Sequence, residues 1–172
     1  MITERGIAVL VEAIDAVRVL ADQTCAGVHA QLRSPVVDEH EGLRAFLGEI
    51  EAESDRIGSD LGSSLTRFPA HASTARRTVA ALVGTAARFV ESARADQAAS
   101  RLLRDDYVAL SLARIQTRML EATAQSLEDR ETERLAARWR LHLGAQLERI
   151  ESTLAIVLQR ELRERDSAFP ET

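Results

Sequence analysis

The sequence has no lysine and no asparagine, so all 22 of its basic residues are arginine. Without lysine the chain can form neither a Schiff base nor a phosphate-binding P-loop, and without asparagine it has no acceptor for N-glycosylation. Lysine and asparagine have AT-rich codons, so their absence indicates a bacterial genome of high GC content. Arginine also pairs bidentately with carboxylates, which favours a surface network of ion pairs.

Cysteine occurs once, at Cys25, which excludes an intrachain disulfide and a cysteine-based zinc site and favours a reducing, cytoplasmic location. Aromatic residues make up only 3% of the chain, too few for a base-stacking platform. A net charge of −5 argues against a general nucleic-acid binder. No apolar run reaches the roughly 18 residues that a membrane span requires. Acidic residues interrupt the N-terminal apolar region, whereas the apolar region of a signal peptide has no such charges. We therefore expect neither a nucleic-acid nor a membrane partner.

Helical periodicity is what the 172 residues do contain, with 45% hydrophobic and 28% charged residues. These proportions are typical of a globular protein, and no linker is long enough to divide residues 1–172 into two domains. The pattern predicts five helices at about residues 3–32, 35–67, 73–94, 100–127 and 131–165. Long helices joined by short turns favour an all-α, antiparallel four-helix bundle, in which the shorter helix 73–94 is an additional crossover.

Apolar residues recur at three- and four-residue steps along the long helices and predict their inward faces. Ser34 and Pro35 are a start signal for the second helix. The predicted inward residues are Ile7, Leu10, Ile14, Val17, Ala21, Thr24 and Val28 in the first helix, Val36, Leu43, Leu47, Ile50, Ile57, Leu61 and Phe68 in the second, and Leu135, Trp139, Leu143, Leu147, Ile150, Leu154, Val157 and Leu158 in the last.

The helix at 100–127 is apolar on two sides, which predicts a central position in the bundle. If one core cannot cover both sides, the remainder is an exposed apolar patch of the kind that marks an interface, and a twofold dimer is the simplest assembly. The stripe of this helix consists of Val108, Leu112, Ile115, Met119 and Ala122, with Leu103, Leu110, Leu120 and Leu127 on a second flank.

The order of elements resembles a known family. The segment SPVVDEHEGLRAFLGEIEAESDRI, followed by the short helix TVAALVGTAARFVESA and two long helices, is similar to the bacterial YciF-type ferritin-like stress proteins over roughly Leu32 to Leu158. The resemblance implies a ferritin-like four-helix bundle with a small extra helix. It also implies a di-metal carboxylate site and a role in the stress response.

The metal ligands of that family are missing from this sequence. A di-metal site uses Glu-x-x-His pairs, in which both ligands lie on one face of a helix, and no such pair occurs here. The family's Glu-His-x-Glu run falls near Leu110, Ser111 and Ala113, and the span from Tyr107 to Leu120 contains no Asp, Glu, His or Cys. We therefore expect no catalytic residue and no cofactor.

A few residues remain as candidates for a nonstandard metal site. Glu49 and Glu53 are one turn apart on the second helix, and His142 falls where the family tends to place an acidic residue. Solvent-facing ion pairs for the two carboxylates and an ordinary interface position for the histidine are the competing interpretation. Glu148 and Glu151 fit surface ion pairs in the same way.

Two further side chains have a simple structural interpretation. His40 lies on the apolar side of the second helix, where burial beside a carboxylate would make it a pH-sensitive group, although a position near a helix end is the plainer reading. Cys25 lies on the inward seam of the first helix and is expected to be packed rather than to act as a nucleophile.

The leading hypothesis is a non-enzymatic, cytoplasmic, ferritin-like bundle without a di-metal site, which acts through protein–protein contacts or self-assembly as a dimer or larger oligomer. A second hypothesis is a metal-binding stress-response protein that uses Glu49, Glu53 and His142. A third is a carrier of an apolar ligand, held in a void between the four long helices.

Overall fold

The computed structural model describes residues 3–68 and 98–168, and these residues form four long helices and one short 3-10 turn. The helices are α1 (Glu4–Gln31), α2 (Leu43–Leu65), α5 (Ala99–Ser126) and α6 (Arg130–Ala168), and the 3-10 turn η1 covers Pro35–Val37. An all-α bundle, as the periodicity predicts, is therefore confirmed for this part of the chain. The helix predicted at 73–94 lies outside the described residues.

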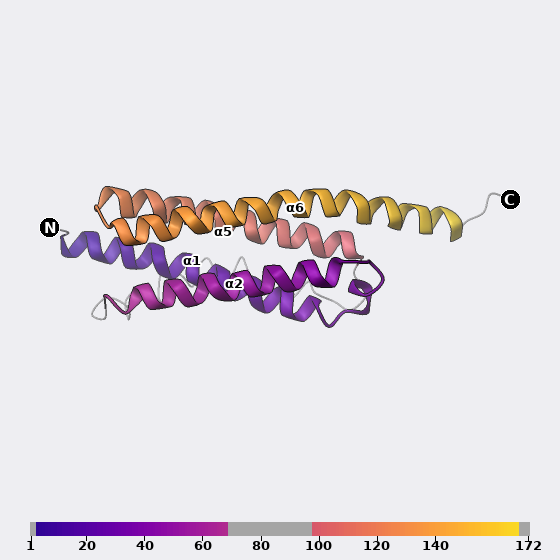
Figure 1. The fold of residues 1–172 in the computed structure, drawn as a ribbon, viewed down its shortest axis with the longest axis horizontal. Coiled ribbons are helices and arrows are strands. Elements are labelled where there is room, and N and C mark those ends of the chain that lie inside the picture. The colour runs from indigo at the N-terminus through magenta and orange to yellow at the C-terminus, as the bar shows by residue number, and fades with distance from the viewer. Residues whose placement is uncertain (1–2, 69–97, 169–172) are drawn as a thin grey trace.

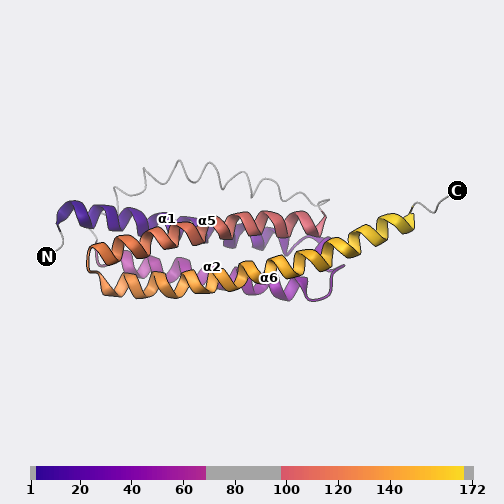
Figure 2. The same ribbon diagram turned by 90° about the horizontal axis from the view of Figure 1, so that it is seen from above.

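The four helices lie side by side, as Figures 1 and 2 show from two directions. Helices α1 and α2 run in opposite directions, α5 runs in the same direction as α2, and α6 returns the other way (Figure 1). Helix α1 packs closely against α2 and α5, and α5 against α6, whereas the backbones of α2 and α6 approach closely at few positions. The C-terminal part of α6 projects beyond the other helices (Figure 2).

The core lies along the axis between the helices and consists of aliphatic side chains with two aromatic rings, Phe46 and Trp139. The predicted seam of α1 is confirmed: Leu10, Ile14 and Val28 are fully buried, and Ile7 is half-buried at the end of the helix. The predicted seams of α2 and α6 are also buried along most of their length, but Leu158 of α6 is 45% exposed. A seam of large aliphatic residues at this spacing is the normal way in which a surface helix is anchored to a core.

The prediction of one continuous helix over residues 35–67 is wrong. Pro35 does begin a helical turn, but that turn ends at Val37, and α2 begins only at Leu43. Between them Gly42 has a φ of +78°, a left-handed conformation that glycine adopts without steric cost. The resulting corner buries Val37 and His40 at the end of the bundle, so tertiary packing outweighs the helical start signal at Ser34.

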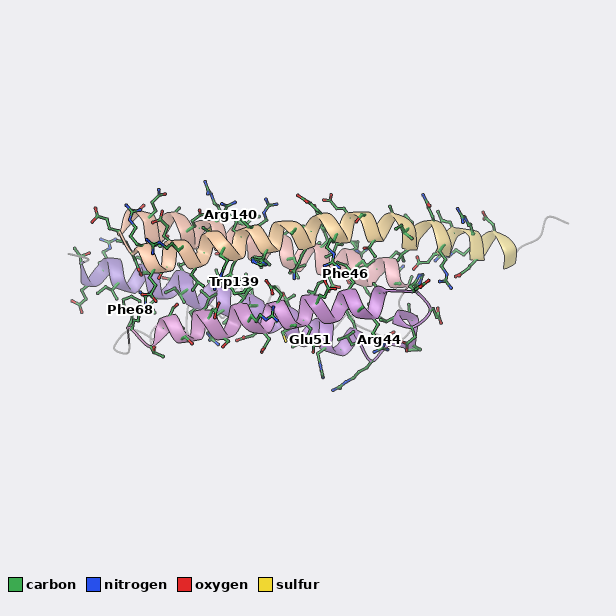
Figure 3. The ribbon with its side chains drawn as sticks, in the orientation of Figure 1. Arg44, Phe46, Glu51, Phe68, Trp139 and Arg140 are labelled. Atoms are coloured by element: carbon green, nitrogen blue, oxygen red, sulfur yellow. The ribbon has the colours of Figure 1, made fainter. Side chains whose placement is uncertain are left out.

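Arg44 holds this corner in place (Figure 3). Its Nε donates to Asp38 Oδ1 at 2.6 Å and its Nη1 to the carbonyl of Leu32 at 2.8 Å, which joins the beginning of α2 to the end of α1. The hydrogen bond from Arg44 lowers the pKa of Asp38.

Candidate functional site

Helix α5 has two lengthwise seams of side chains, each with alternating three- and four-residue steps. The inward seam faces the core and is buried. It consists of Ala99, Leu103, Asp106, Leu110, Ala113, Thr117, Leu120 and Ala124. The outward seam lies on the opposite side and consists of Val108, Leu112, Ile115, Met119 and Ala122.

The outward seam is the first of the two apolar sides that the sequence predicts for this helix. Val108, Ile115 and Met119 are 41%, 58% and 56% exposed, whereas Leu112 is half-buried and packs partly against the core. The flank that includes Leu110 is the one that faces inward. The sequence alone does not decide between the two sides, because the inward seam contains alanine, threonine and aspartate and is less hydrophobic than the seam that faces away from the core.

A groove runs beside the outward seam, between α5 and α6. It has a volume of about 520 Å³ and is lined by Tyr107, Ser111, Arg114, Ile115, Arg118, Met119, Arg140 and Leu147. Polar contacts border it: the Tyr107 hydroxyl donates to Glu151 at 2.7 Å, and Arg140 Nε donates to Glu121 at 2.7 Å. Burial alone would raise the pKa of Glu121, but the hydrogen bonds from its arginine partners outweigh it and lower that pKa. An apolar stripe beside a groove with a polar border has the composition of a binding surface.

Asp106 is a buried carboxyl group in the inward seam, and the sequence analysis did not identify it. It is 4% exposed, and its Oδ1 accepts a hydrogen bond of 2.8 Å from Nε2 of Gln31, which is buried on α1. Burial raises the pKa of Asp106 to about 7, although the hydrogen bond from Gln31 opposes the shift. The sequence does indicate that Asp106 is buried, because it lies three residues after Leu103 and four before Leu110, which is the spacing of residues along a buried helix face.

Glu53 and His142, two of the three candidate metal ligands, lie next to each other between α2 and α6. His142 Nδ1 is 2.8 Å from Glu53 Oε1, within ion-pair distance. Glu53 Oε1 nevertheless has no hydrogen-bond partner, which means that the angles of this contact do not suit a hydrogen bond. The other oxygen of Glu53 accepts from Arg56 at 3.2 Å. The His142 ring also packs against Trp139, with ring centroids 5.4 Å apart.

Glu49 lines the same shallow depression as Glu53 and His142, but it is paired with Arg149, and the hydrogen bond from that arginine lowers the pKa of Glu49. Arg56 and Arg149 both border the depression and would repel a cation. Among residues 3–68 and 98–168, no group of three His, Cys, Asp or Glu side chains is arranged to hold a metal ion. The contacts of these three residues favour ion pairing between helices.

The α2–α6 seam is bridged by a series of such pairs along its length. Arg138 donates to Asp60 at 2.6 Å, and Arg67, just beyond α2, donates to Glu131 at 3.0 Å. Two aromatic residues of the core, Phe46 and Trp139, lie on α2 and α6 (Figure 3), and Arg138 Cζ is 4.9 Å from the ring centroid of Trp139. Arg149 of α6 covers the ring of Phe46, with its Cζ 4.6 Å from the ring centroid.

The remaining candidates have structural surroundings. Cys25 is half-buried, and burial is the main cause that raises the pKa of its thiol, so the reactive thiolate is disfavoured at neutral pH. His40 is 7% exposed in the corner before α2. Glu151 accepts from Tyr107, and Glu148 is exposed to solvent. None of the described contacts favours the nonstandard metal site or the apolar ligand carrier, and both stay predictions.

No protein-family model, curated protein or solved structure matches this chain. Within the part of the chain that the structure describes, no helix combines the length and apolar character required to cross a membrane.

Proposed function

We propose that this protein is a non-enzymatic, ferritin-like helical bundle that acts through protein–protein contacts, with self-assembly as the first of them. The observation that carries the proposal is the outward seam of α5. Its three most exposed members, Val108, Ile115 and Met119, lie on one side of a single helix. Exposed apolar residues gathered in this way mark interaction surfaces, whereas single exposed residues do not.

The connectivity supports the ferritin-like part of the proposal. Helices α2 and α5 run in the same direction, so α2 ends and α5 begins at opposite ends of the bundle (Figure 1). One long crossover in a four-helix bundle is the ferritin-like arrangement, and the antiparallel pairing of neighbouring helices fits it.

The interior of the bundle supports the non-enzymatic part. The resemblance aligns a metal-binding run of the family with Leu110, Ser111 and Ala113, and two of these positions, Leu110 and Ala113, are in the inward seam. Aliphatic side chains supply no oxygen or nitrogen to a metal at that place. A cytoplasmic location and a role in the stress response stay predictions of the sequence.

Two measurements on protein purified from its native host test the proposal. The mass of the native assembly is expected to exceed that of the single 18.9 kDa chain. Metal analysis is expected to find no stoichiometric iron, manganese or zinc. A monomer that binds no other protein at any concentration would contradict the interaction role, and one tightly bound metal per chain would contradict the loss of the metal site.

A further inference from the structure

The outward seam of α5 has the regularity of a helix-packing surface. Its members follow steps of four, three, four and three residues, a mean repeat of about 3.5 residues, which is the repeat of side chains that pack against a neighbouring helix. The inward seam of the same helix has the same rhythm and is occupied by the bundle core. The outward seam is built for a second helical neighbour.

We infer that this neighbour is α5 of a second copy of the chain, packed antiparallel about a twofold axis between Leu112 and Ile115. The inference rests on the proposed function and specifies its geometry. A twofold axis at that point pairs Leu112 with the Ile115 of the other copy, and Val108 with its Met119. Every large apolar residue of the seam then has an apolar partner, so the stripe is complementary to itself.

The charges at the two ends of the seam favour the antiparallel direction. Arg101 continues the seam toward the beginning of α5 and is exposed. In an antiparallel pair it lies at the C-terminal end of the opposite α5, beside Ser126 and the exposed Glu128. The helix dipole makes that end negative, so the arginine is attracted to both the helix end and the carboxylate. A parallel pair would bring the two Arg101 side chains together.

The size of the surface shows that α5 cannot provide the whole interface by itself. A helix of 28 residues is about 42 Å long and presents a strip of roughly 400 Å², about half of what each partner of a stable dimer buries. The groove between α5 and α6 supplies adjoining area, since Ile115 and Met119 belong to both the seam and the groove.

Distances between spin labels on the two copies test this geometry. Two serines of α5, Ser111 near the proposed axis and Ser126 at the end of the helix, are replaced singly by cysteine in a Cys25→Ser background, which removes the only native thiol. Along the helix axis the antiparallel pair separates the two copies of residue 111 by about 8 Å and those of residue 126 by about 38 Å, at 1.5 Å per residue. A parallel pair gives the same distance at both positions. A short distance at 111 and a long one at 126 supports the inference.

The mass of the same labelled samples separates the two proposals. If a dimer forms but the two distances are equal, or both long, the α5 pairing is wrong while self-assembly stands. If the protein is monomeric at every concentration, both self-assembly and the pairing are overturned.

A matched pair of charge substitutions gives a second readout. Ile115→Glu is expected to raise the dimer dissociation constant more than tenfold, because it buries two carboxylates beside each other at the axis. Leu141→Glu on α6, where the side chain is 64% exposed, serves as the control and should leave the constant unchanged. If Ile115→Glu instead lowers the unfolding midpoint of a monomer, Ile115 is already packed within the single chain and the inference is wrong.

Discussion

Asp106 and Gln31 form a buried pair in which one oxygen of each side chain has no hydrogen-bond partner. Asp106 Oδ1 accepts from the amide of Gln31, while Asp106 Oδ2 and Gln31 Oε1 are both buried without a partner. A carboxylic acid can donate from its second oxygen to the amide oxygen, whereas a carboxylate cannot. Burial raises the pKa of Asp106 to about 7, because the charged carboxylate loses its hydration in the core, and the hydrogen bond from Gln31 only partly offsets this.

The raised pKa makes stability depend on pH in a defined direction. Between the ordinary value of 3.8 and about 7, the folded state holds a proton at Asp106 that the unfolded state has lost. The free energy of unfolding therefore falls as pH rises through this window and is constant above it, as far as this group is concerned.

Asp106→Asn removes this dependence, because asparagine resembles the protonated acid. We expect the variant to match the native protein near pH 4 and to exceed its free energy of unfolding by about 2–4 kcal/mol at pH 8. Denaturant unfolding at several pH values measures the difference, with Asp105→Asn as the control for a charge change one residue away. A constant difference across this range would show that Asp106 is ionised in the folded protein.

At the scale of single elements, sequence patterns predicted α1 and α6 well because their buried seams consist of large aliphatic residues. They left open which side of α5 is buried, because Ala113, Thr117 and Asp106 occupy that side. Spacing shows that a helix has two sides, but the choice between the sides depends on neighbouring helices and on small residues that permit close approach. The pairing of Glu53 with His142 was equally hidden, because it depends on the register between two helices.

Because one side of α5 is buried and the other is exposed, substitution by alanine is expected to reduce stability much more at Leu110 than at Ile115. Leu110→Ala removes a side chain that is 1% exposed and is expected to cost about 2–5 kcal/mol, through lost burial and the cavity left behind. Ile115→Ala changes an exposed side chain and should alter stability by no more than about 0.5 kcal/mol. Chemical denaturation at low protein concentration, where no second copy covers the outward seam, measures both. Equal costs would contradict the assigned orientation of α5.

Replacing glycine by alanine is expected to have opposite effects on stability at two positions near the beginning of α2, Gly42 and Gly48. Gly42→Ala places a side chain at φ +78° and should destabilise the fold by about 1 kcal/mol. Gly48→Ala lies inside α2 with no atom within 4 Å of the added methyl group, and should stabilise it by about 0.5–1 kcal/mol. Thermal unfolding of the two variants compares them directly. A gain at both positions would mean that residues 38–42 can continue the helix.

At the scale of the whole molecule, the bundle has three closely packed sides and one that depends on charge. Between α2 and α6 the backbones approach closely at few positions, and the ion pairs Arg138–Asp60 and Arg149–Glu49, with the contact between His142 and Glu53, join the two helices. Exposed pairs of this kind contribute little individually, and salt screens them. The α2–α6 side is therefore expected to weaken first when ionic strength rises.

A double-mutant cycle on Arg138 and Asp60 tests whether salt-sensitive ion pairs bridge α2 and α6. Both side chains are substantially exposed, at 54% and 40%. The coupling free energy from Arg138→Gln, Asp60→Asn and the double variant is expected to be about 0.2–1 kcal/mol at low salt, and to approach zero near 1 M NaCl. The same cycle on Arg160 and Glu164, a pair within α6, is the control for an ion pair that joins no two helices. A coupling that stays above about 2 kcal/mol in high salt is the mark of a desolvated pair, and would place α2 and α6 in tight contact like the other three sides.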